Sequence, residues 1–223
     1  MNIEKRNAGW RAAEYVEDGM VVGLGTGSTA KYAIEKIGER IQDEGLDIAG
    51  IPTSLETEKR AEKAGIELVE LDEADKIDLT IDGADEVNPN KRLIKGGGGA
   101  LLREKIIAYN SKKYIVIVDP SKEVEKLGVD FPLPVEVLSK WQKGVADCVR
   151  KLGCEPEVRT NDGEAFLTDN GNNILDCDFD GIPRPEKLSK RLNYIPGVLE
   201  HGLFIDVTDL VIIGKENGFE ELD

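Results

Sequence analysis

Short apolar runs alternate with helix-like stretches along the first half of the chain, and this alternation limits the folds that the chain can adopt. The runs cover residues 20–24, 48–51, 66–69, 79–81 and 114–118. Between the first two runs, residues 29–41 carry apolar side chains at helical spacing with charged side chains between them, as expected of a helix that packs on a sheet. The pattern predicts an α/β fold with a doubly wound sheet.

The chain changes character after residue 118. Asp119-Pro120 and the proline-rich residues 131–134 interrupt regular structure and predict a boundary near residue 130. Beyond it, short strand-like runs and two helix-like stretches predict a small α+β unit. They cover residues 135–138, 139–152, 155–159, 165–168, 174–177 and 185–192. Residues 202–205 and 210–213 are expected to return as strands to the larger sheet, so the predicted domains are 1–129 with 203–223, and 130–202.

The composition excludes several classes of protein. Of 223 residues, 40% are hydrophobic, and no apolar run reaches the ~20 residues of a membrane span. The first residues lack the features of a secretory signal, so we expect a soluble, cytoplasmic protein with no membrane partner. A net charge of −15 argues against nucleic-acid binding, which depends on neutralising phosphates with Lys and Arg. An anionic substrate therefore needs a local site made from backbone N–H groups and a few lysines.

Cysteine and histidine residues are sparse. Cys148, Cys154 and Cys177 form no C-x-x-C pair, which argues against a zinc site or a disulfide framework, and we expect buried thiols. His201 is the only histidine, so histidine-rich metal sites and two-histidine mechanisms are excluded. A structural role is expected for His201.

A glycine-rich segment, residues 23–29, lies between a predicted strand and a predicted helix. Its glycines allow backbone N–H groups to converge on an anion at the helix N-terminus, and Thr26, Ser28 and Thr29 add hydroxyl donors. Residues 25–30 match the dinucleotide motif G-x-G-x-x-A, but the second predicted strand does not end on the acidic residue that NAD binding requires. The lysine of a nucleotide-triphosphate loop is also missing. A small-phosphate site is favoured, with a tight turn without ligand as the alternative.

Two carboxylates follow the apolar run 79–81 in the sequence Asp82-Gly83-Ala84-Asp85. They are predicted to lie at the C-terminal end of a strand, where open α/β sheets bind ligands. Solvated turn carboxylates and a magnesium site are two interpretations. The third is that both carboxylates form hydrogen bonds with sugar hydroxyls and handle protons.

A lysine, a run of four glycines and a glutamate occur within residues 95–105. Interior glycines destabilise regular elements by roughly 0.5 to 1 kcal/mol each, so the run indicates close approach of a ligand. Lys95 and Glu104 across a small cavity can act as an acid/base pair, although Glu104 alone would be interpreted as a solvated helix residue. Lys122 follows the apolar run 114–118, so it also falls at the ligand edge of the predicted sheet.

At these residues the chain resembles ribose-5-phosphate isomerase of the A type. The segments that carry the resemblance are residues 25–29, 82–85, 95–105, 131–137 and 168–172, which span nearly the whole chain. The resemblance implies reversible conversion of D-ribose 5-phosphate to D-ribulose 5-phosphate in the non-oxidative pentose phosphate pathway, without metal or organic cofactor. It also implies a Rossmann-like main domain, a small ferredoxin-like lid or oligomerisation domain, and a homodimer or homotetramer.

The resemblance further implies roles for single residues, with Glu104 as the proton acceptor. The implied substrate-binding residues are Thr26, Gly27, Ser28, Thr29, Asp82, Gly83, Ala84, Asp85, Lys95, Gly96, Gly97, Gly98 and Lys122. Isomerisation through an enediolate needs one base and a positive group near the developing oxyanion, which fits Glu104 and Lys95. Asp82 and Asp85 can hold the open-chain hydroxyls and assist ring opening. Gly99 stands where some members of the family have alanine, a change between small residues.

Two other functions compete with the isomerase. A sugar-phosphate-binding sensor domain on a related scaffold would keep the phosphate loop but need neither Glu104 nor Lys95. The sequence shows no attached helix-turn-helix, which counts against the sensor. An amino-sugar phosphate deaminase would favour a histidine in the pocket. The presence of Glu104 together with Lys95 favours the isomerase.

Overall fold

The computed structural model describes residues 2–223, which form two compact units. The first unit contains the chain up to Ala84, Arg103–Lys122 and Val207–Asp223. The second unit contains Asp85–Leu102 and Glu123–Asp206. Each unit is therefore assembled from stretches that are separated in the sequence.

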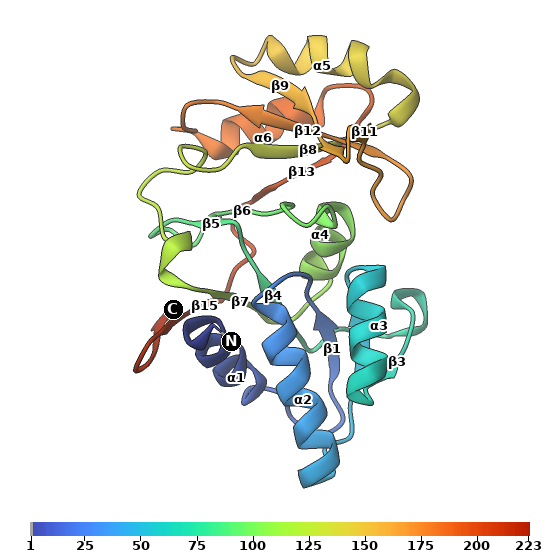
Figure 1. Ribbon diagram of the computed structural model, residues 1–223, viewed down its shortest axis with the longest axis vertical. Coiled ribbons are helices and arrows are strands. Elements are labelled where there is room, and N and C mark those ends of the chain that lie inside the picture. The colour runs from blue at the N-terminus through green and yellow to red at the C-terminus, as the bar shows by residue number, and fades with distance from the viewer. Residues whose placement is uncertain (1) are drawn as a thin grey trace. The chain divides into compact units, whose positions relative to one another are not determined.

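A seven-stranded sheet forms the centre of the first unit (Figure 1). In spatial order its strands are β16 (Gly218–Leu222), β15 (Leu210–Lys215), β7 (Tyr114–Val118), β4 (Leu79–Gly83), β1 (Val21–Leu24), β2 (Ala49–Pro52) and β3 (Glu67–Leu68). All neighbours are parallel except β15 and β16, which are antiparallel. This arrangement confirms the predicted α/β fold. The chain runs outward from β1 through β2 and β3 and then returns to β4 on the other side of β1, which makes β1 and β4 a switch point where ligands bind.

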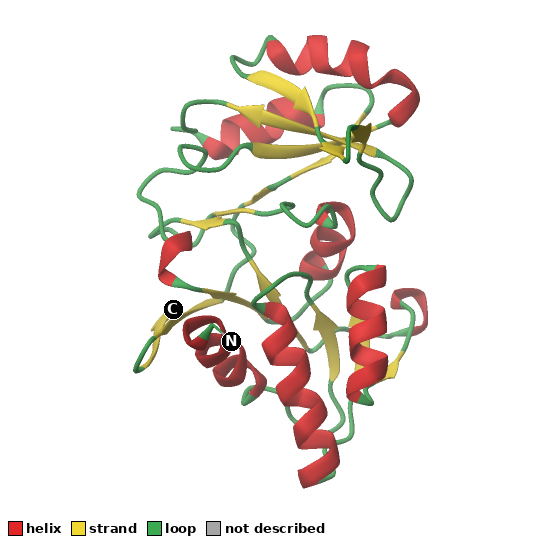
Figure 2. Cartoon of the chain, viewed as in Figure 1, coloured by secondary structure: helices red, strands yellow, loops and turns green. Residues whose placement is uncertain are grey.

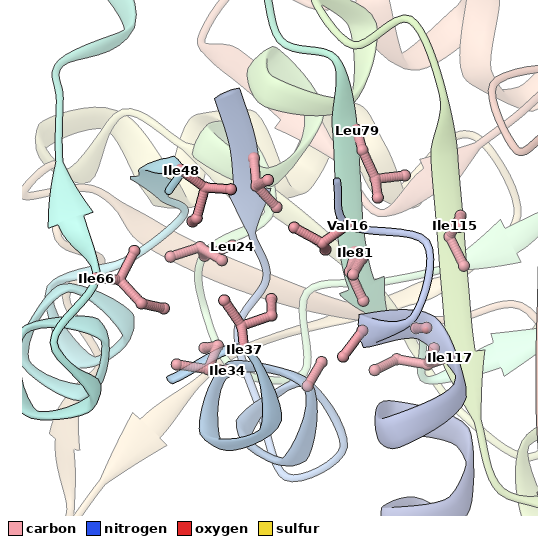
Figure 3. Packing of buried hydrophobic residues seen from close by; sticks show 14 of the residues in the cluster. Val16, Leu24, Ile34, Ile37, Ile48, Ile66, Leu79, Ile81, Ile115 and Ile117 are labelled. Carbon is pink, nitrogen blue, oxygen red and sulfur yellow. The ribbon is translucent and has the colours of Figure 1, made fainter. Parts of the chain in front are cut away.

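Helices cover both faces of this sheet. They are α1 (Ile3–Ala13), α2 (Ala30–Glu44), α3 (Leu55–Ala64) and α4 (Leu101–Tyr109). Residues of α1, α2 and α3 share one hydrophobic core with alternate residues of the strands, and Figure 3 shows Leu24 and Ile81 of the sheet beside Ile34 and Ile37 of α2. A second cluster joins Ile107 of α4 to the other face. Because both faces are covered, the central strands are mostly apolar, as parallel strands usually are, and the exceptions in β4 are Thr80 and Asp82.

The second unit contains a four-stranded antiparallel sheet with two helices on one face. The order is β13 (Val198–His201), β8 (Leu133–Val137), β12 (Asn173–Asp178) and β9 (Glu155–Val158). Helix α5 (Gln142–Arg150) joins β8 to β9, and α6 (Pro185–Asn193) joins β12 to β13. Buried residues of β8, β12, α5 and α6 form one hydrophobic core. The β-α-β-β-α-β sequence of elements is that of a ferredoxin-like fold, as expected.

Short strands make up the rest of the second unit, joined by long loops (Figure 2). A three-stranded sheet consists of β14 (Leu203–Phe204), β6 (Leu93–Ile94) and β5 (Glu86–Val87), and a hairpin consists of β10 (Thr160–Asn161) and β11 (Glu164–Ala165). The expectation that residues 202–205 join the larger sheet is wrong, because Leu203 pairs with Ile94 and its side chain enters the core of the second unit. Residues 210–213 do join the larger sheet, within β15. Three 3-10 turns complete the structure: η1 (Leu71–Glu73), η2 (Pro120–Lys122) and η3 (Ser139–Trp141).

The cysteines differ in exposure. Cys154 and Cys177 are buried as predicted, whereas Cys148 is exposed, because it lies on the solvent face of α5, whose buried residues are Val145, Ala146 and Val149. No helix among residues 2–223 combines the length and the apolar character needed to cross a membrane.

Candidate active site

One carboxylate ties the end of β4 to the loop that follows β1. Asp82 Oδ1 accepts hydrogen bonds from the backbone N–H of Thr26 at 3.1 Å and from that of Gly83 at 2.8 Å. The two segments approach so closely that a Cβ at Gly25 would overlap Oδ1 of Asp82, which explains why residue 25 is glycine. The first two predicted motifs therefore meet within the first unit.

The hydroxyl of Thr26 belongs to a cluster of side-chain hydroxyls at the start of α3. Its partners are the hydroxyls of Thr53 at 2.7 Å, Ser54 at 2.8 Å and Thr57 at 3.2 Å. Gly27 and Ser28 are exposed, and Thr29 occupies the N-cap position of the 15-residue helix α2. The N-terminus of a helix attracts anions through its unpaired N–H groups and its dipole, so this end of α2 can bind a phosphate.

A lysine that no sequence motif marks also contacts this loop. Lys5 of α1 donates a hydrogen bond from Nζ to Ser28 Oγ at 2.8 Å and lies 3.7 Å from Asp119 Oδ2. Burial opposes the ionisation of Asp119, but hydrogen bonds from Ser121 and the charges of Lys5 and Lys122 lower its pKa overall. Lys5 and the predicted Lys122 therefore both act on Asp119, which directly follows β7.

Glu104 lies in the first turn of α4 and is only 5% exposed. It shares the interior of the first unit with Asp82, which is 0% exposed, and with Tyr114 of β7. The Tyr114 hydroxyl donates a hydrogen bond to Asp82 Oδ2 at 3.4 Å. Burial, followed by the negative charges of Asp82 and Glu104, raises the pKa of Tyr114 well above its ordinary value, so the phenol remains protonated near neutral pH. Glu104 is thus a buried carboxylate rather than the solvated helix residue that its sequence context alone would favour.

The remaining predicted residues lie in the second unit. Asp85 Oδ2 accepts a hydrogen bond from the backbone N–H of Gly97 at 2.7 Å, and the backbone N–H of Asp85 donates to Ile94 at 2.8 Å. Lys95 is only 2% exposed, and its Nζ lies 5.4 Å from the centre of the Phe204 ring, a cation–π contact. The second carboxylate of the D-G-A-D sequence therefore contacts the glycine run that follows Lys95.

Comparison with known proteins identifies the family. The model of the family described as ribose 5-phosphate isomerase A (phosphoriboisomerase A) matches residues 49–218. The chain is also 54% identical to ribose-5-phosphate isomerase A 1 of Oceanobacillus iheyensis, over 96% of this chain and 95% of that one. The chain belongs to the ribose 5-phosphate isomerase A family.

Solved structures of ribose 5-phosphate isomerases have the same fold. The enzyme from Methanocaldococcus jannaschii is 43% identical and superposes with a TM-score of 0.94 over 98% of this chain and 97% of that one. A D-ribose-5-phosphate isomerase in complex with phospho-erythronic acid is 41% identical and superposes with a TM-score of 0.96 over the whole of both chains. The likeness therefore includes both units.

The predicted site residues divide between the two units. Thr26, Gly27, Ser28, Thr29, Asp82, Gly83, Ala84, Glu104 and Lys122 belong to the first, and Asp85, Lys95, Gly96, Gly97 and Gly98 belong to the second. The chain passes directly from one set to the other at Ala84–Asp85. His201 is buried, and its Nδ1 accepts a hydrogen bond from the backbone N–H of Leu203 at 3.2 Å, which fits the predicted structural role. Among residues 2–223, no three His, Cys, Asp or Glu side chains are arranged to hold a metal ion.

Proposed function

We propose that Glu104, Lys95, Asp82 and Asp85 carry out the reversible isomerisation of D-ribose 5-phosphate to D-ribulose 5-phosphate. As a member of its family, the chain is a ribose-5-phosphate isomerase of the pentose phosphate pathway, and its substrate is a sugar phosphate. The observation that carries the proposed residue roles is the burial of Glu104 beside Asp82 and Tyr114 in the first unit. A base in such surroundings is held in a fixed orientation and shielded from bulk water.

The phosphate of the substrate is proposed to bind at the N-terminus of α2. Gly27 and Ser28 are exposed there, and Lys5 Nζ lies 2.8 Å from Ser28 Oγ. Lys122 supplies a second positive charge close to Asp119. Because the protein carries a net charge of −15, these local groups have to overcome its long-range repulsion of an anionic substrate. The Thr26 hydroxyl holds the loop through its hydrogen bonds with Thr53 and Ser54, and we assign Thr29 to the phosphate together with Gly27 and Ser28.

The proton transfer is assigned to Glu104. In the open-chain aldose, the Glu104 carboxylate takes the proton from C2, the electron pair forms the C1–C2 double bond, and the carbonyl oxygen on C1 becomes an oxyanion. The Lys95 ammonium group stabilises that oxyanion. The same proton then returns to C1, and the hydroxyl proton on O2 passes to the oxygen on C1 to give the ketose. All bonds and electrons are accounted for by the substrate and a single carboxyl group, and we propose that the reaction uses no metal and no organic cofactor.

The two aspartates are assigned to the sugar hydroxyls and to ring opening. Asp85 uses Oδ2 to hold Gly97, and we assign its carboxylate also to a hydroxyl of the open-chain sugar. Asp82 holds Thr26 and Gly83 through Oδ1, so part of its contribution is to fix the phosphate loop. Gly83 and Ala84 link β4 to Asp85, and Gly96, Gly97 and Gly98 provide room for the sugar backbone.

The assembly and the domain roles are also proposals. We assign residues 1–129 with 203–223 to catalysis and residues 130–202 to a lid or to oligomerisation. The compact units differ from this functional division, since residues 85–102, 123–129 and 203–206 group with the second unit. Large exposed side chains in the second unit include Trp141 at 62% and Tyr194 at 86% exposed, which favours a homodimer or homotetramer that uses this surface. Light scattering with size-exclusion chromatography measures the assembly, and a monomer would contradict the proposal.

The test of the catalytic assignment is an assay of ribose 5-phosphate conversion in the presence of EDTA. We expect full activity for the parent protein and a loss on the order of 10²-fold or more for Glu104→Gln, with phospho-erythronic acid as a competitive inhibitor that both proteins still bind. Glu62→Gln, at an exposed position of α3, is the matched control and should retain parental turnover. Normal turnover by Glu104→Gln would refute the base assignment, and inhibition by EDTA would refute the metal-free reaction.

A further inference from the structure

An arginine outside every predicted motif holds the glycine run of the second unit. Arg159 Nη1 donates hydrogen bonds to the backbone carbonyls of Gly96 at 2.8 Å and Gly97 at 3.1 Å. Its Nε and Nη2 donate to the two carboxylate oxygens of Asp176 on β12 at 2.9 and 2.6 Å. The guanidinium group is therefore fixed by a bidentate pair on one side and holds two consecutive carbonyls on the other.

Phe166, which directly follows the β10–β11 hairpin, contacts the same glycine run a second time. The ring of Phe166 lies against Gly99, where a Cβ would be 2.5 Å from Phe166 Cζ. Gly99 also has a φ of +82°, which non-glycine residues rarely adopt. Backbone hydrogen bonds link Arg159 to Phe166 at 2.8 Å and to Ile174 of β12 at 2.9 Å. Both contacts therefore originate from one segment that is anchored on the four-stranded sheet.

These contacts offset the conformational entropy that the glycine run loses when it is ordered. Fixing the backbone of one residue costs roughly 1 to 2 kcal/mol in conformational entropy, and glycines lose more freedom than other residues. Gly97 and Gly98 are exposed, so packing alone does not order them. With both carbonyls bound by Arg159 and the Gly97 N–H bound by Asp85, the peptide planes next to Lys95 are held in one orientation.

We propose that Arg159 is a positioning residue that orders residues 95–99 before substrate binds, with Asp176 orienting its guanidinium group. This inference rests on the proposed function of Lys95 and the glycine run. A lysine could not replace the arginine, because only the planar guanidinium group donates in two directions with a fixed geometry. Arg159 thus acts on the reaction through residues 95–99.

The test compares Arg159→Lys and Asp176→Asn with Arg150→Lys, a control on α5 whose arginine pairs with the carboxylates of Asp147 and Glu155. We expect kcat/KM to fall about 10- to 100-fold in Arg159→Lys, because misplacing groups around a reacting centre lowers the rate by this order. The fall should be smaller in Asp176→Asn and absent in the control. We also expect hydrogen–deuterium exchange of a peptide that covers residues 95–102 to become at least about tenfold faster in Arg159→Lys. Added methylguanidinium should restore part of the activity of Arg159→Ala.

The possible failures are distinguishable. If Lys95→Ala has normal turnover, the proposed function of this loop is wrong, whatever Arg159 does. If Lys95→Ala is impaired while Arg159→Lys and Asp176→Asn both keep parental kinetics and parental exchange, the positioning role of Arg159 is refuted. Should Arg159→Lys be too unstable to assay, Asp176→Asn decides the question: slower turnover with faster loop exchange supports the proposal, and parental values overturn it.

Discussion

At the scale of single residues, Asp82 connects three parts of the first unit. Its carboxylate accepts hydrogen bonds from the loop after β1 at Thr26, from its own strand end at Gly83, and from Tyr114 of β7. Buried carboxylates persist only when hydrogen bonds replace the lost water, and these three contacts do so. The position of the loop at residues 25–29 therefore depends on Asp82.

Gly25→Ala tests this dependence. The added Cβ would overlap the Asp82 carboxylate and its Cα, so we expect a loss of about 1 to 3 kcal/mol in the free energy of unfolding and a higher KM. Urea denaturation and steady-state kinetics measure both. Gly144→Ala, at an exposed helical position with open space around it, should instead be neutral or stabilise by about 0.5 to 1 kcal/mol. A parental KM in Gly25→Ala would contradict the close approach.

Tyr114→Phe tests the buried phenol. The raised pKa of Tyr114 means that the folded protein keeps this proton when the unfolded chain loses it, so the parent should lose stability as the pH rises above about 10. Without the hydroxyl this loss should be smaller, while at neutral pH the variant should be about 1 kcal/mol less stable than the parent. Urea denaturation at two pH values measures the difference. Tyr194→Phe, which alters an exposed tyrosine, should behave like the parent, and an equal alkaline loss in parent and Tyr114→Phe would argue against a buried neutral phenol.

Sequence reasoning found some of these residues and missed others for a clear reason. Glu104 and Asp82 stand beside glycine-rich motifs, which mark them as unusual. Lys5 and Arg159 stand in charged, ordinary surroundings, and their contacts join residues 23 and 63 positions apart. Such contacts arise from the fold, so a single sequence carries no local signal for them.

At the scale of elements, α1 and α2 cooperate at the proposed phosphate site. Helix α2 contributes its N-terminus, and the first turn of α1 contributes Lys5. The partial positive charge of a helix N-terminus and a lysine act in the same direction on an anion. The site is therefore built from two helices that pack on the same face of the sheet.

Lys5→Ala should weaken substrate binding more than turnover. We expect KM to rise on the order of tenfold while kcat changes little, because a charge on the phosphate acts equally in the ground state and the transition state. Steady-state kinetics with ribose 5-phosphate measures both constants. Lys36→Ala on α2, where the lysine pairs with Glu39 at 3.0 Å, removes an equal charge away from this loop and should leave KM unchanged. A fall in kcat alone would assign Lys5 to another role.

The strands of the larger sheet were predicted correctly where they form short apolar runs. The five apolar runs correspond to β1, β2, β3, β4 and β7, because the strands of a sheet that helices cover on both faces are rich in apolar residues. The pairing of β14 was predicted wrongly, since its partner β6 has only two residues. A run of two residues has no periodicity that could identify it as a strand, so the three-stranded sheet of β14, β6 and β5 could not be predicted.

At the scale of the whole molecule, the net charge of −15 affects both stability and binding. Like charges repel one another in the compact state and also repel a phosphorylated substrate. The local cations at Lys5 and Lys122 act only over short distances by comparison. Screening of these charges by salt should therefore raise the stability of the fold and also strengthen substrate binding.

Raising the ionic strength from about 10 mM to about 150 mM shortens the screening length from ~30 Å to ~8 Å. We expect the thermal unfolding midpoint to rise and the KM for ribose 5-phosphate to fall over this range. Calorimetry and kinetics in sodium chloride and in potassium chloride measure the effect, and the two salts should agree because screening depends on ionic strength alone. A midpoint that falls with salt would show that attractive ion pairs outweigh the repulsion.

The position of β15 in the larger sheet has a consequence for protein synthesis. Strand β7 is apolar and buried along its whole length, and one of its two neighbours is β15, at residues Leu210–Lys215. Until the ribosome has made those residues, the nascent chain carries β7 as an open edge, which can pair with other chains. Strand β15 follows β1, β2, β3, β4 and β7 in the chain, so the open edge of β7 persists until β15 has been made. A chain that is released after residue 206 should therefore aggregate through this edge rather than form a smaller working enzyme.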